Sequence, residues 1–497
     1  MKDVKTRIFL VLLVIFYFAT RLVNLKIIPI FTDEAIYSFW AQVALHDPAN
    51  RFISLEDGKQ PLFIWLAAIS QKFVADPLVA SRLVSVFAGF GSLIGIYLLT
   101  KELFDKKTAI LASFLYIVLP FTLLYDRMAL FDSLLTMLGI YAVFFTFKMV
   151  KDPRLDTAIL NGFAIGLAMI TKSSGNFFLY LLPFSLIFAN FKQKKIAQFF
   201  AKWIALSAVA VFISLVIYNS LRLSPLFYII ARKNLEFIRS YPEVIKNPFE
   251  YLVPNFKAIV GWVITYVQLP VFILFIAGII YAFIKRNIAA IYLLILVLIP
   301  FTAELIFNKV LYPRFVLFYF PYIILIIAYF AASIINDQKR LQNISIIVLS
   351  LALLMPAVTS FRLLTSPTLA KIPKNDADQY LNDWPAGYGI SEVEDFLKKE
   401  SKGQDVYVGT EDTFGLLPYA LNIYFFGQNN VHIYSYWPVD VDKLPGEFMD
   451  LAKNGHKTYF IYYQTKKEIT NINLRLIARY QQGIGQSFMR FYEVNPK

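Results

Sequence analysis

The sequence contains no cysteine and only three histidines among its 497 residues. The lack of cysteine excludes disulfides, thiolate metal sites and cysteine nucleophiles. His46, His432 and His456 do not have ligand spacing to one another, which argues against a histidine-based zinc site. Charge is also scarce, since 16% of the residues are charged against about 25% in an average soluble domain.

Apolar residues are correspondingly abundant. They make up 58% of the chain, aromatic residues make up 17%, and the mean hydropathy is +0.57. Such an excess over a soluble domain predicts a protein that buries much of its surface in lipid. The net charge of +14 would indicate nucleic acid in a soluble protein. Here the basic residues lie between apolar runs, as membrane topology requires, so we expect no nucleic-acid partner.

Apolar stretches close to the roughly 20 residues that cross a bilayer recur up to about residue 360. We predict eleven spans, and the first is retained as an anchor because no signal-peptide cleavage site follows it. The predicted spans are residues 8–28, 79–100, 109–124, 129–149, 157–172, 175–191, 203–220, 259–284, 288–306, 314–335 and 342–360.

The basic residues between these spans predict the orientation. If the N-terminus is cytoplasmic, every alternate loop is basic, which agrees with the positive-inside rule. These clusters lie at Lys2/Lys5/Arg7, Lys101/Lys106/Lys107, Lys148/Lys151/Arg154, Lys192/Lys194/Lys195/Lys202, Lys285/Arg286 and Lys339/Arg340. An odd number of spans then places the C-terminus outside a cell membrane that the chain crosses many times.

The composition changes after residue 360, which divides the chain into a membrane domain, 1–360, and a C-terminal domain, 365–497. Short β-branched and aromatic runs there alternate with helical patterns, which predicts an extracytoplasmic α/β domain. The predicted strands are Val406–Thr410, Val431–Tyr436, Thr458–Tyr463 and Phe488–Val494, and the predicted helices are Phe414–Phe426, Pro445–Ala452 and Ile472–Tyr480.

Two adjacent carboxylates, Asp33 and Glu34, directly follow the first predicted span in the run Thr32-Asp33-Glu34-Ala35-Ile36-Tyr37. One interpretation is structural: Thr32 caps an interfacial helix, and acidic residues favour its first turn. The other interpretation is chemical: one carboxylate is a general base held at the membrane surface. The residues alone leave both interpretations open.

The same outer loop continues to Lys59 in Asp57-Gly58-Lys59-Gln60-Pro61, where the glycine and proline predict a turn. The amphipathic segment that follows, 63–73, is expected to lie along the interface. Lys59 then sits at the depth of the lipid headgroups. There it either snorkels towards water or binds a lipid phosphate as a point charge.

Asp132 ends a short outer turn, Tyr125-Asp126-Arg127-Met128-Ala129-Leu130-Phe131-Asp132. A carboxylate at membrane depth costs about 2.5–3.5 kcal/mol on insertion scales, so it is expected to face a partner or a cavity. Lys172 ends another predicted span on the same side, and Glu304 and Arg314 bracket a further outer loop. This convergence on one membrane face predicts a functional site there.

The outer loop 221–258 is net basic, which runs against the positive-inside trend. It is expected either to bind anionic lipid headgroups or to cover a bound phosphate. The residues do not distinguish these two roles.

Together, the motifs resemble those of membrane glycosyltransferases with the GT-C fold, namely protein O-mannosyltransferases, aminoarabinose transferases and their relatives in glycosyltransferase family 39. The resemblance covers about residues 8–360. It rests on Thr32-Asp33-Glu34-Ala35-Ile36-Tyr37, Lys59-Gln60-Pro61-Leu62, Arg127-Met128-Ala129-Leu130-Phe131-Asp132-Ser133, Gly166–Lys172 and Tyr312-Pro313-Arg314-Phe315.

The resemblance implies an α-helical polytopic membrane enzyme that takes a sugar from a polyprenyl-phosphate donor. Transfer would occur with inversion, on the extracytoplasmic face, to a hydroxyl of a lipid, glycan or protein acceptor. It implies Asp33 as the catalytic base. The full set of candidate site residues comprises Asp33, Glu34 and Asp132 for catalysis and Lys59, Arg127, Lys172 and Arg314 for the donor phosphate.

The expected chemistry agrees with this inventory of residues. A phosphate monoester has a second pKa near ~6, so the lipid phosphate leaves as an anion without a protonated acid. It needs cations to stabilise the growing charge and one carboxylate base, unlike glycosidases with paired acids. No cofactor is required by this scheme, although a divalent cation held by Asp33, Glu34 and Asp132 is left open.

Two features depart from the resemblance. Gln60 stands where the related motif usually has a second proline. The sequence also has no tandem lumenal repeats of the eukaryotic protein mannosyltransferases, which argues against a protein acceptor.

Two other readings remain. One is a transporter or lipid flippase, although such proteins usually show internal repeats and broken helices near the midplane. The other is a glycan polymerase or ligase of the same fold that uses a lipid-diphosphate donor.

Overall fold

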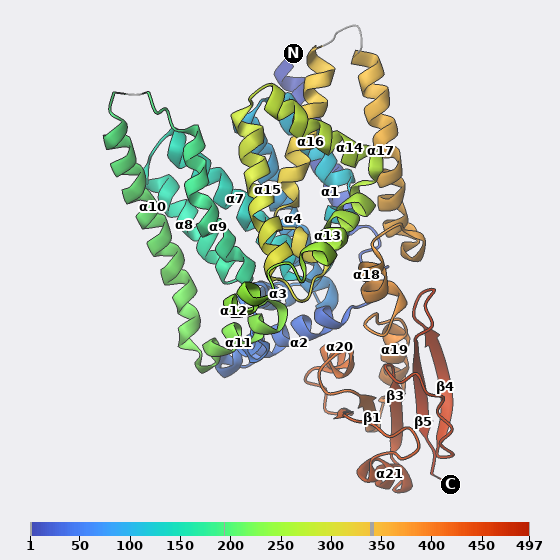
Figure 1. Ribbon diagram of the computed structural model, residues 1–497. Helices are drawn as coiled ribbons and strands as arrows, with labels where there is room; N and C mark the ends of the chain where they lie inside the picture. Colours follow the sequence, from blue (N-terminus) through green and yellow to red (C-terminus); the bar gives the residue numbers. More distant parts are fainter. Residues whose placement is uncertain (1, 193, 338–341, 497) are drawn as a thin grey trace.

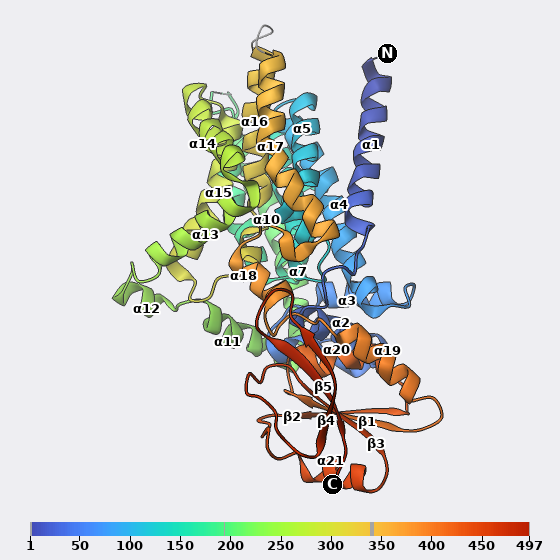
Figure 2. The ribbon, with the colours of Figure 1, turned by 90° about the vertical axis from the view of Figure 1, so that its right-hand side faces the viewer.

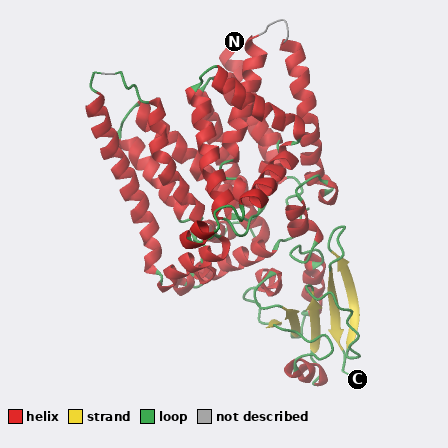
Figure 3. Ribbon diagram, in the orientation of Figure 1, coloured by secondary structure: helices red, strands yellow, loops and turns green. Residues whose placement is uncertain are grey.

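The computed structural model describes residues 2–192, 194–337 and 342–496 and is mainly helical (Figures 1 and 3). The first part of the bundle contains α1 (Lys2–Leu22), α2 (Thr32–His46), α3 (Leu62–Gln71), α4 (Pro77–Leu103), α5 (Lys106–Val118), α6 (Pro120–Tyr125), α7 (Phe131–Lys151), α8 (Leu155–Met169), α9 (Phe177–Leu181) and α10 (Ile196–Asn219). The second part contains α11 (Tyr228–Phe237), α12 (Tyr241–Lys246), α13 (Leu252–Val267), α14 (Leu269–Ile284), α15 (Ile288–Phe307), α16 (Phe320–Asp337) and α17 (Gln342–Thr365).

Each of the eleven predicted spans overlaps a helix of this bundle. Within the described residues, five helices are long and apolar enough to cross a membrane, and a bent pair makes a sixth if it counts as one span. The five are Pro77–Leu103, Phe131–Lys151, Ile196–Leu223, Ile288–Phe307 and Gln342–Thr365. The chain is therefore a multi-pass membrane protein, while the count of eleven and the orientation in the cell stay predictions.

The predicted span 259–284 is not one straight helix. The segment consists of α13 and α14, which meet at an angle of 112°. Gln268, between them, has a positive φ of 66°, and Pro270 follows within the first turn of α14. Proline fits the first turn of a helix, where no backbone N–H is needed. Unbroken apolarity over the two helices hid this bend.

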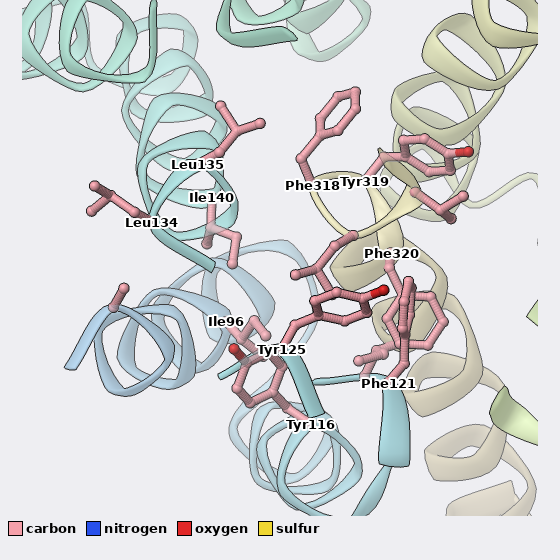
Figure 4. Packing of buried hydrophobic residues seen from close by; sticks show 14 of the residues in the cluster. Ile96, Tyr116, Phe121, Tyr125, Leu134, Leu135, Ile140, Phe318, Tyr319 and Phe320 are labelled. Atoms are coloured by element: carbon pink, nitrogen blue, oxygen red, sulfur yellow. The ribbon is translucent and has the colours of Figure 1, made fainter. Parts of the chain in front are cut away.

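The bundle core forms where α4, α5, α6 and α16 meet (Figure 4). Ile96, Tyr116, Phe121, Tyr125 and Phe320 are all buried there. The Phe121 ring packs edge-on against Phe320, with centroids 4.8 Å apart. Such aromatic packing fixes the turn after α6, and this turn leads into the motif that contains Asp132.

The C-terminal part contains α18 (Lys374–Ala377), α19 (Ile390–Glu400), β1 (Val406–Glu411), α20 (Leu416–Phe425), β2 (Val431–Tyr436), α21 (Gly446–Lys453), β3 (Lys457–Tyr462), β4 (Leu474–Gln481) and β5 (Phe488–Val494). The sheet order is β2-β1-β3-β5-β4. The strand β1 runs parallel to β2 and β3, and β5 runs antiparallel to β3 and β4. The predicted α/β class is confirmed, and the four predicted strands are present.

The predicted helix Ile472–Tyr480 is instead β4. Its residues pair with β5 in a register that matches Leu474 with Val494 and Gln481 with Phe488. Strand pairing with a neighbouring segment outweighs a local pattern that fits a helix, because β-structure depends on cross-strand packing.

The sheet lies beyond the end of the bundle that is opposite the N-terminus (Figure 1). Its helix α20 packs on α2, and the two lie side by side in both views (Figures 1 and 2). Gln42 of α2 donates to the Ile423 carbonyl at 2.8 Å, and the core of the sheet includes Ile30 and Ala35. The C-terminal part is therefore built onto the helix that carries Asp33 and Glu34.

Candidate active site

The first turn of α2 holds the two adjacent carboxylates, but they face different surroundings. The Glu34 side chain is fully buried, and Arg82 of α4 donates to both of its oxygens at 2.8 and 2.7 Å. The backbone N–H groups of Phe31 and Ala129 also donate to this carboxylate, at 3.0 and 2.7 Å. Glu34 therefore ties α2, α4 and the turn before α7 together, and this geometry argues against its predicted catalytic role.

The Asp33 carboxylate is paired with a cation from a distant part of the chain, Arg314. The Arg314 guanidinium, in the short helix η7 (Pro313–Val316), donates to Asp33 Oδ2 at 2.8 Å. The Asp33 side chain keeps 24% of its surface exposed and the Arg314 side chain 13%. Asp33 is therefore an accessible carboxylate next to a cation, as a base acting on an incoming hydroxyl would need to be.

A second open ion pair joins α7 to the end of α8. Lys172 Nζ donates to Asp132 Oδ1 at 2.6 Å, and the same ammonium lies over the Phe315 ring, 4.4 Å from its centroid. Asp132 is almost buried while Lys172 is partly exposed. The predicted partner for the intramembrane carboxylate is thus present, and Asp132 holds Lys172 in place.

Lys59 lies in the turn after η2 (Ile53–Asp57). Gly58 adopts a left-handed conformation with φ of +64°, and a Cβ there would lie 2.6 Å from Cβ of Lys233. Glycine is therefore needed both for the turn and for the close approach of α11. Asp57 accepts from Lys233 at 2.8 Å and lies 3.8 Å from Lys59 Nζ. Burial lowers the pKa of the Lys59 amine, while Asp57 and Asp33 oppose this effect.

Lys59, Asp132, Lys172 and Arg314 line a cavity of about 750 Å³. Asp33 does not line this cavity but is joined to it through its hydrogen bond with Arg314. Among the described residues that line it, the charged ones are Lys59, Lys172, Lys233, Arg239, Arg314, Asp132 and Glu304. Basic side chains thus outnumber acidic ones five to two along its wall. Apolar side chains such as Phe177 and Phe307 complete the lining. The cavity therefore suits an anion that carries an apolar chain.

Lys233 and Arg239 also line the cavity, although they were not among the predicted site residues. Both come from the net-basic loop 221–258. That loop gave the only signal, since its charge favoured either headgroup binding or a cover over a phosphate. The position of α11 beside the cavity supports the second of these roles.

Arg127, which was expected at the donor phosphate, lies elsewhere. Its guanidinium is buried and donates to the backbone carbonyls of Arg21, Val23 and Asn24 at 2.7–2.9 Å. It therefore satisfies the carbonyl groups at the end of α1. Its place in the fold argues against contact with a donor.

A buried carboxylate that the sequence did not single out lies behind the site. Asp376 of α18 accepts from the hydroxyls of Tyr125, at 2.7 Å, and Tyr266. Burial raises the pKa of Asp376 to about 7, although the two hydroxyls and Arg314 act in the opposite direction. Local sequence could not indicate this contact, because both tyrosines lie more than 100 residues away from Asp376.

A divalent cation was left open from the sequence. The described residues contain no group of three His, Cys, Asp or Glu side chains that would hold one. Each of the three carboxylates considered for it faces a cation of the protein: Asp33 faces Arg314, Glu34 faces Arg82 and Asp132 faces Lys172.

Comparisons with known proteins indicate the fold and the class of enzyme. Residues 58–218 match the family model described as dolichyl-phosphate-mannose-protein mannosyltransferase, and no curated protein sequence matches the chain. ArnT from Cupriavidus metallidurans, solved bound to undecaprenyl phosphate, is similar with a TM-score of 0.59 and 13% identity over 100% of both chains. The Archaeoglobus fulgidus oligosaccharyltransferase, solved with zinc and sulfate, is similar with a TM-score of 0.55 and 14% identity over 91% of this chain and 67% of the other.

The chain therefore has the GT-C fold of membrane glycosyltransferases, and residues 58–218 match a family model of such enzymes. This confirms the predicted fold class and enzyme class. The alternative of a transporter or flippase finds no support in either comparison.

Proposed function

We propose that the protein is an inverting glycosyltransferase that moves a sugar from a polyprenyl-phosphate carrier to an acceptor hydroxyl on the extracytoplasmic face of the cell membrane. The acceptor is a lipid, a glycan or a protein. The observation that carries the proposal is the basic, partly apolar cavity beside the accessible pair of Asp33 and Arg314. ArnT and the archaeal oligosaccharyltransferase AglB, both of similar fold, have been solved with undecaprenyl phosphate and dolichol phosphate respectively.

The cations of the cavity would hold the donor phosphate. Lys59 and Lys172 provide point charges, and Arg314 offers a planar fork that suits phosphate oxygens. Charge on the phosphate grows as the bond from sugar C1 to the phosphate oxygen breaks. Fixed cations along the cavity wall stabilise that growing charge.

Arg314 links the two halves of the reaction. It donates to Asp33 and also lines the cavity. A donor phosphate would attract Arg314 and leave the Asp33 carboxylate free to take the proton of the acceptor hydroxyl. The acceptor oxygen then bonds to C1 on the side opposite the departing phosphate, which inverts the configuration.

Lipid co-purification tests the donor class. The intact protein, extracted in mild detergent, is expected to retain a polyprenyl-phosphate species detectable by mass spectrometry. Lys59→Ala and Lys172→Ala should each reduce its amount, whereas Lys202→Ala, on an exposed lysine near the start of α10, should not. Retention of a lipid diphosphate instead, or equal retention by all three variants, would contradict the proposed donor.

A further inference from the structure

Three uncharged polar side chains form a hydrogen-bonded row along the wall of the cavity. Gln60 Nε2 donates to Ser173 Oγ at 2.7 Å, and Ser173 Oγ donates to Asn234 Oδ1 at 3.1 Å. The three residues come from the turn after η2, from η3 (Ser173–Asn176) and from α11. All three line the cavity, and Gln60 is only 3% exposed.

The row lies next to the cations assigned to the donor phosphate. Gln60 follows Lys59 in the chain, and Ser173 follows Lys172. Because Gln60 and Ser173 are in contact, the two lysines that precede them lie in the same part of the cavity. A donor sugar is joined to its phosphate through one oxygen, so a phosphate held by these lysines leaves the sugar within reach of the row.

Both ends of the row are free for a ligand. Among the residues that the structure describes, none forms a hydrogen bond with Gln60 Oε1 or with Asn234 Nδ2. One end is an acceptor and the other is a donor. Gln60 Oε1 is not among the buried atoms that lack a partner, so this oxygen is accessible to a ligand in the cavity. Two sugar hydroxyls, one donating and one accepting, match these ends.

We propose that Gln60, Ser173 and Asn234 form the subsite that recognises the donor sugar, and that this sugar presents uncharged hydroxyl groups to it. The inference rests on the proposed function and adds a substrate class to it. A site that hydrogen-bonds a substrate hydroxyl discriminates strongly against an analogue without it, because its own polar groups are then left unpaired. Gln60, in place of the proline of the related motif, supplies the first member of the row.

Equilibrium binding separates recognition of the sugar from recognition of the phosphate. The full-length protein in detergent is titrated with undecaprenyl phosphate alone and with undecaprenyl phosphate joined to mannose, glucose or aminoarabinose, and binding is measured by native mass spectrometry. The variants are Gln60→Leu and Asn234→Ala. Gln428→Leu, at an exposed amide on the C-terminal part, is the matched control.

The wild type is expected to bind one neutral sugar lipid about tenfold more tightly than the sugar-free lipid, which is the scale of one buried hydrogen bond. Both variants should lose most of this preference while their affinity for undecaprenyl phosphate stays unchanged. Asn234→Ala, at a partly exposed residue, keeps the test valid if the buried Gln60 variant does not fold. The control should behave as the wild type.

Three results would overturn the inference. The first is an unchanged sugar preference in both variants. The second is an equal loss of affinity for the sugar-linked and sugar-free lipids, which would make the row purely structural. The third is a preference for the aminoarabinose lipid that disappears in Glu304→Gln, because the protein would then recognise the charged amine of the sugar through Glu304, which also lines the cavity. A wild type that binds none of the lipids, the sugar-free one included, would instead reject the proposed donor class.

Discussion

Asp33 and Glu34 are neighbours in the sequence but belong to two different kinds of polar site. Glu34 lies in a closed site, where Arg82 and two backbone N–H groups occupy its oxygens and water is excluded. Asp33 lies in an open site, where Arg314 is its cation and part of its surface is exposed. The same division separates buried Arg127 from Lys59 and Lys172.

The difference shows how a membrane enzyme uses charge for two purposes. Closed groups join helices, since a buried charge is tolerated only when it is paired and hydrogen-bonded. Groups in an open site are partly exposed, so they can exchange a protein partner for a ligand. Adjacent residues separate in this way because successive side chains of a helix point about 100° apart.

The largest effect on activity is expected from Asp33→Asn. The substitution keeps size and hydrogen bonding but removes the proton acceptor, and a well-placed base contributes about 10²–10⁴-fold. Transfer from a polyprenyl-phosphate sugar should fall by that order, while the thermal midpoint and lipid co-purification stay near those of the wild type. Near-normal transfer would mean that Asp33 is not the base. Asp132 would then be the candidate, and the contrast between an open Asp33 and a closed Glu34 would not describe catalysis.

Glu34→Ala should act on stability instead. It leaves the Arg82 guanidinium buried without its partner, and breaking a buried pair in this way costs about 3–5 kcal/mol. We expect a low yield of folded protein and a large fall in the thermal midpoint in detergent. If Glu34→Ala were as stable as Asp33→Asn, the closed site would not have the structural role described here.

Lys172→Ala and Asp132→Asn separate the two members of an open pair. A hydrogen bond to a charged group contributes about 1.5–3 kcal/mol, so loss of the Lys172 ammonium should weaken undecaprenyl-phosphate binding by about 10–100-fold. Asp132→Asn frees this ammonium, and donor binding should be retained. The opposite order of affinities, measured by native mass spectrometry, would mean that Asp132 contributes to binding directly.

The pH dependence of donor binding tests Lys59. Because burial lowers the pKa of this amine, it should lose its proton at a lower pH than a lysine in water, where the pKa is about 10.4. Undecaprenyl-phosphate binding should therefore fall as the pH rises, and it should fall at a lower pH than an ordinary lysine would give. Lys59→Arg stays charged over the same range and should give a flat profile. Identical profiles for the two proteins would exclude Lys59 as the titrating group.

Hydropathy and charge predicted the helical bundle, because each span is a local property of about 20 residues. They also predicted that Asp33, Lys59, Asp132, Lys172 and Arg314 share one end of the bundle. They could not separate Asp33 from Glu34, since that depends on Arg82, 48 residues further along the chain. The bend at Gln268 and the strand β4 were missed for the same reason: both are decided by packing that local patterns do not report.

The smallest effect is expected from Asp376→Asn, which extends the comparison to a closed carboxylate held mainly by tyrosine hydroxyls. In the folded protein the pKa of Asp376 is raised to about 7, whereas an unfolded aspartate titrates near about 3.9. Between these pH values the folded state binds a proton that the unfolded state does not, so the contribution of Asp376 to stability is lost as the pH rises towards 7.

The asparagine of Asp376→Asn cannot ionise but still accepts a hydrogen bond from a tyrosine. The variant should therefore exceed the wild type in thermal midpoint by a few degrees at pH 8, and the difference should shrink as the pH is lowered to 5. Asp378→Asn, two residues away and paired with Lys374 on the surface, is the matched control and should show no such difference. A wild type that is more stable than Asp376→Asn at pH 8 would mean that Asp376 is held as an anion, with Arg314 rather than the hydroxyls as its main partner.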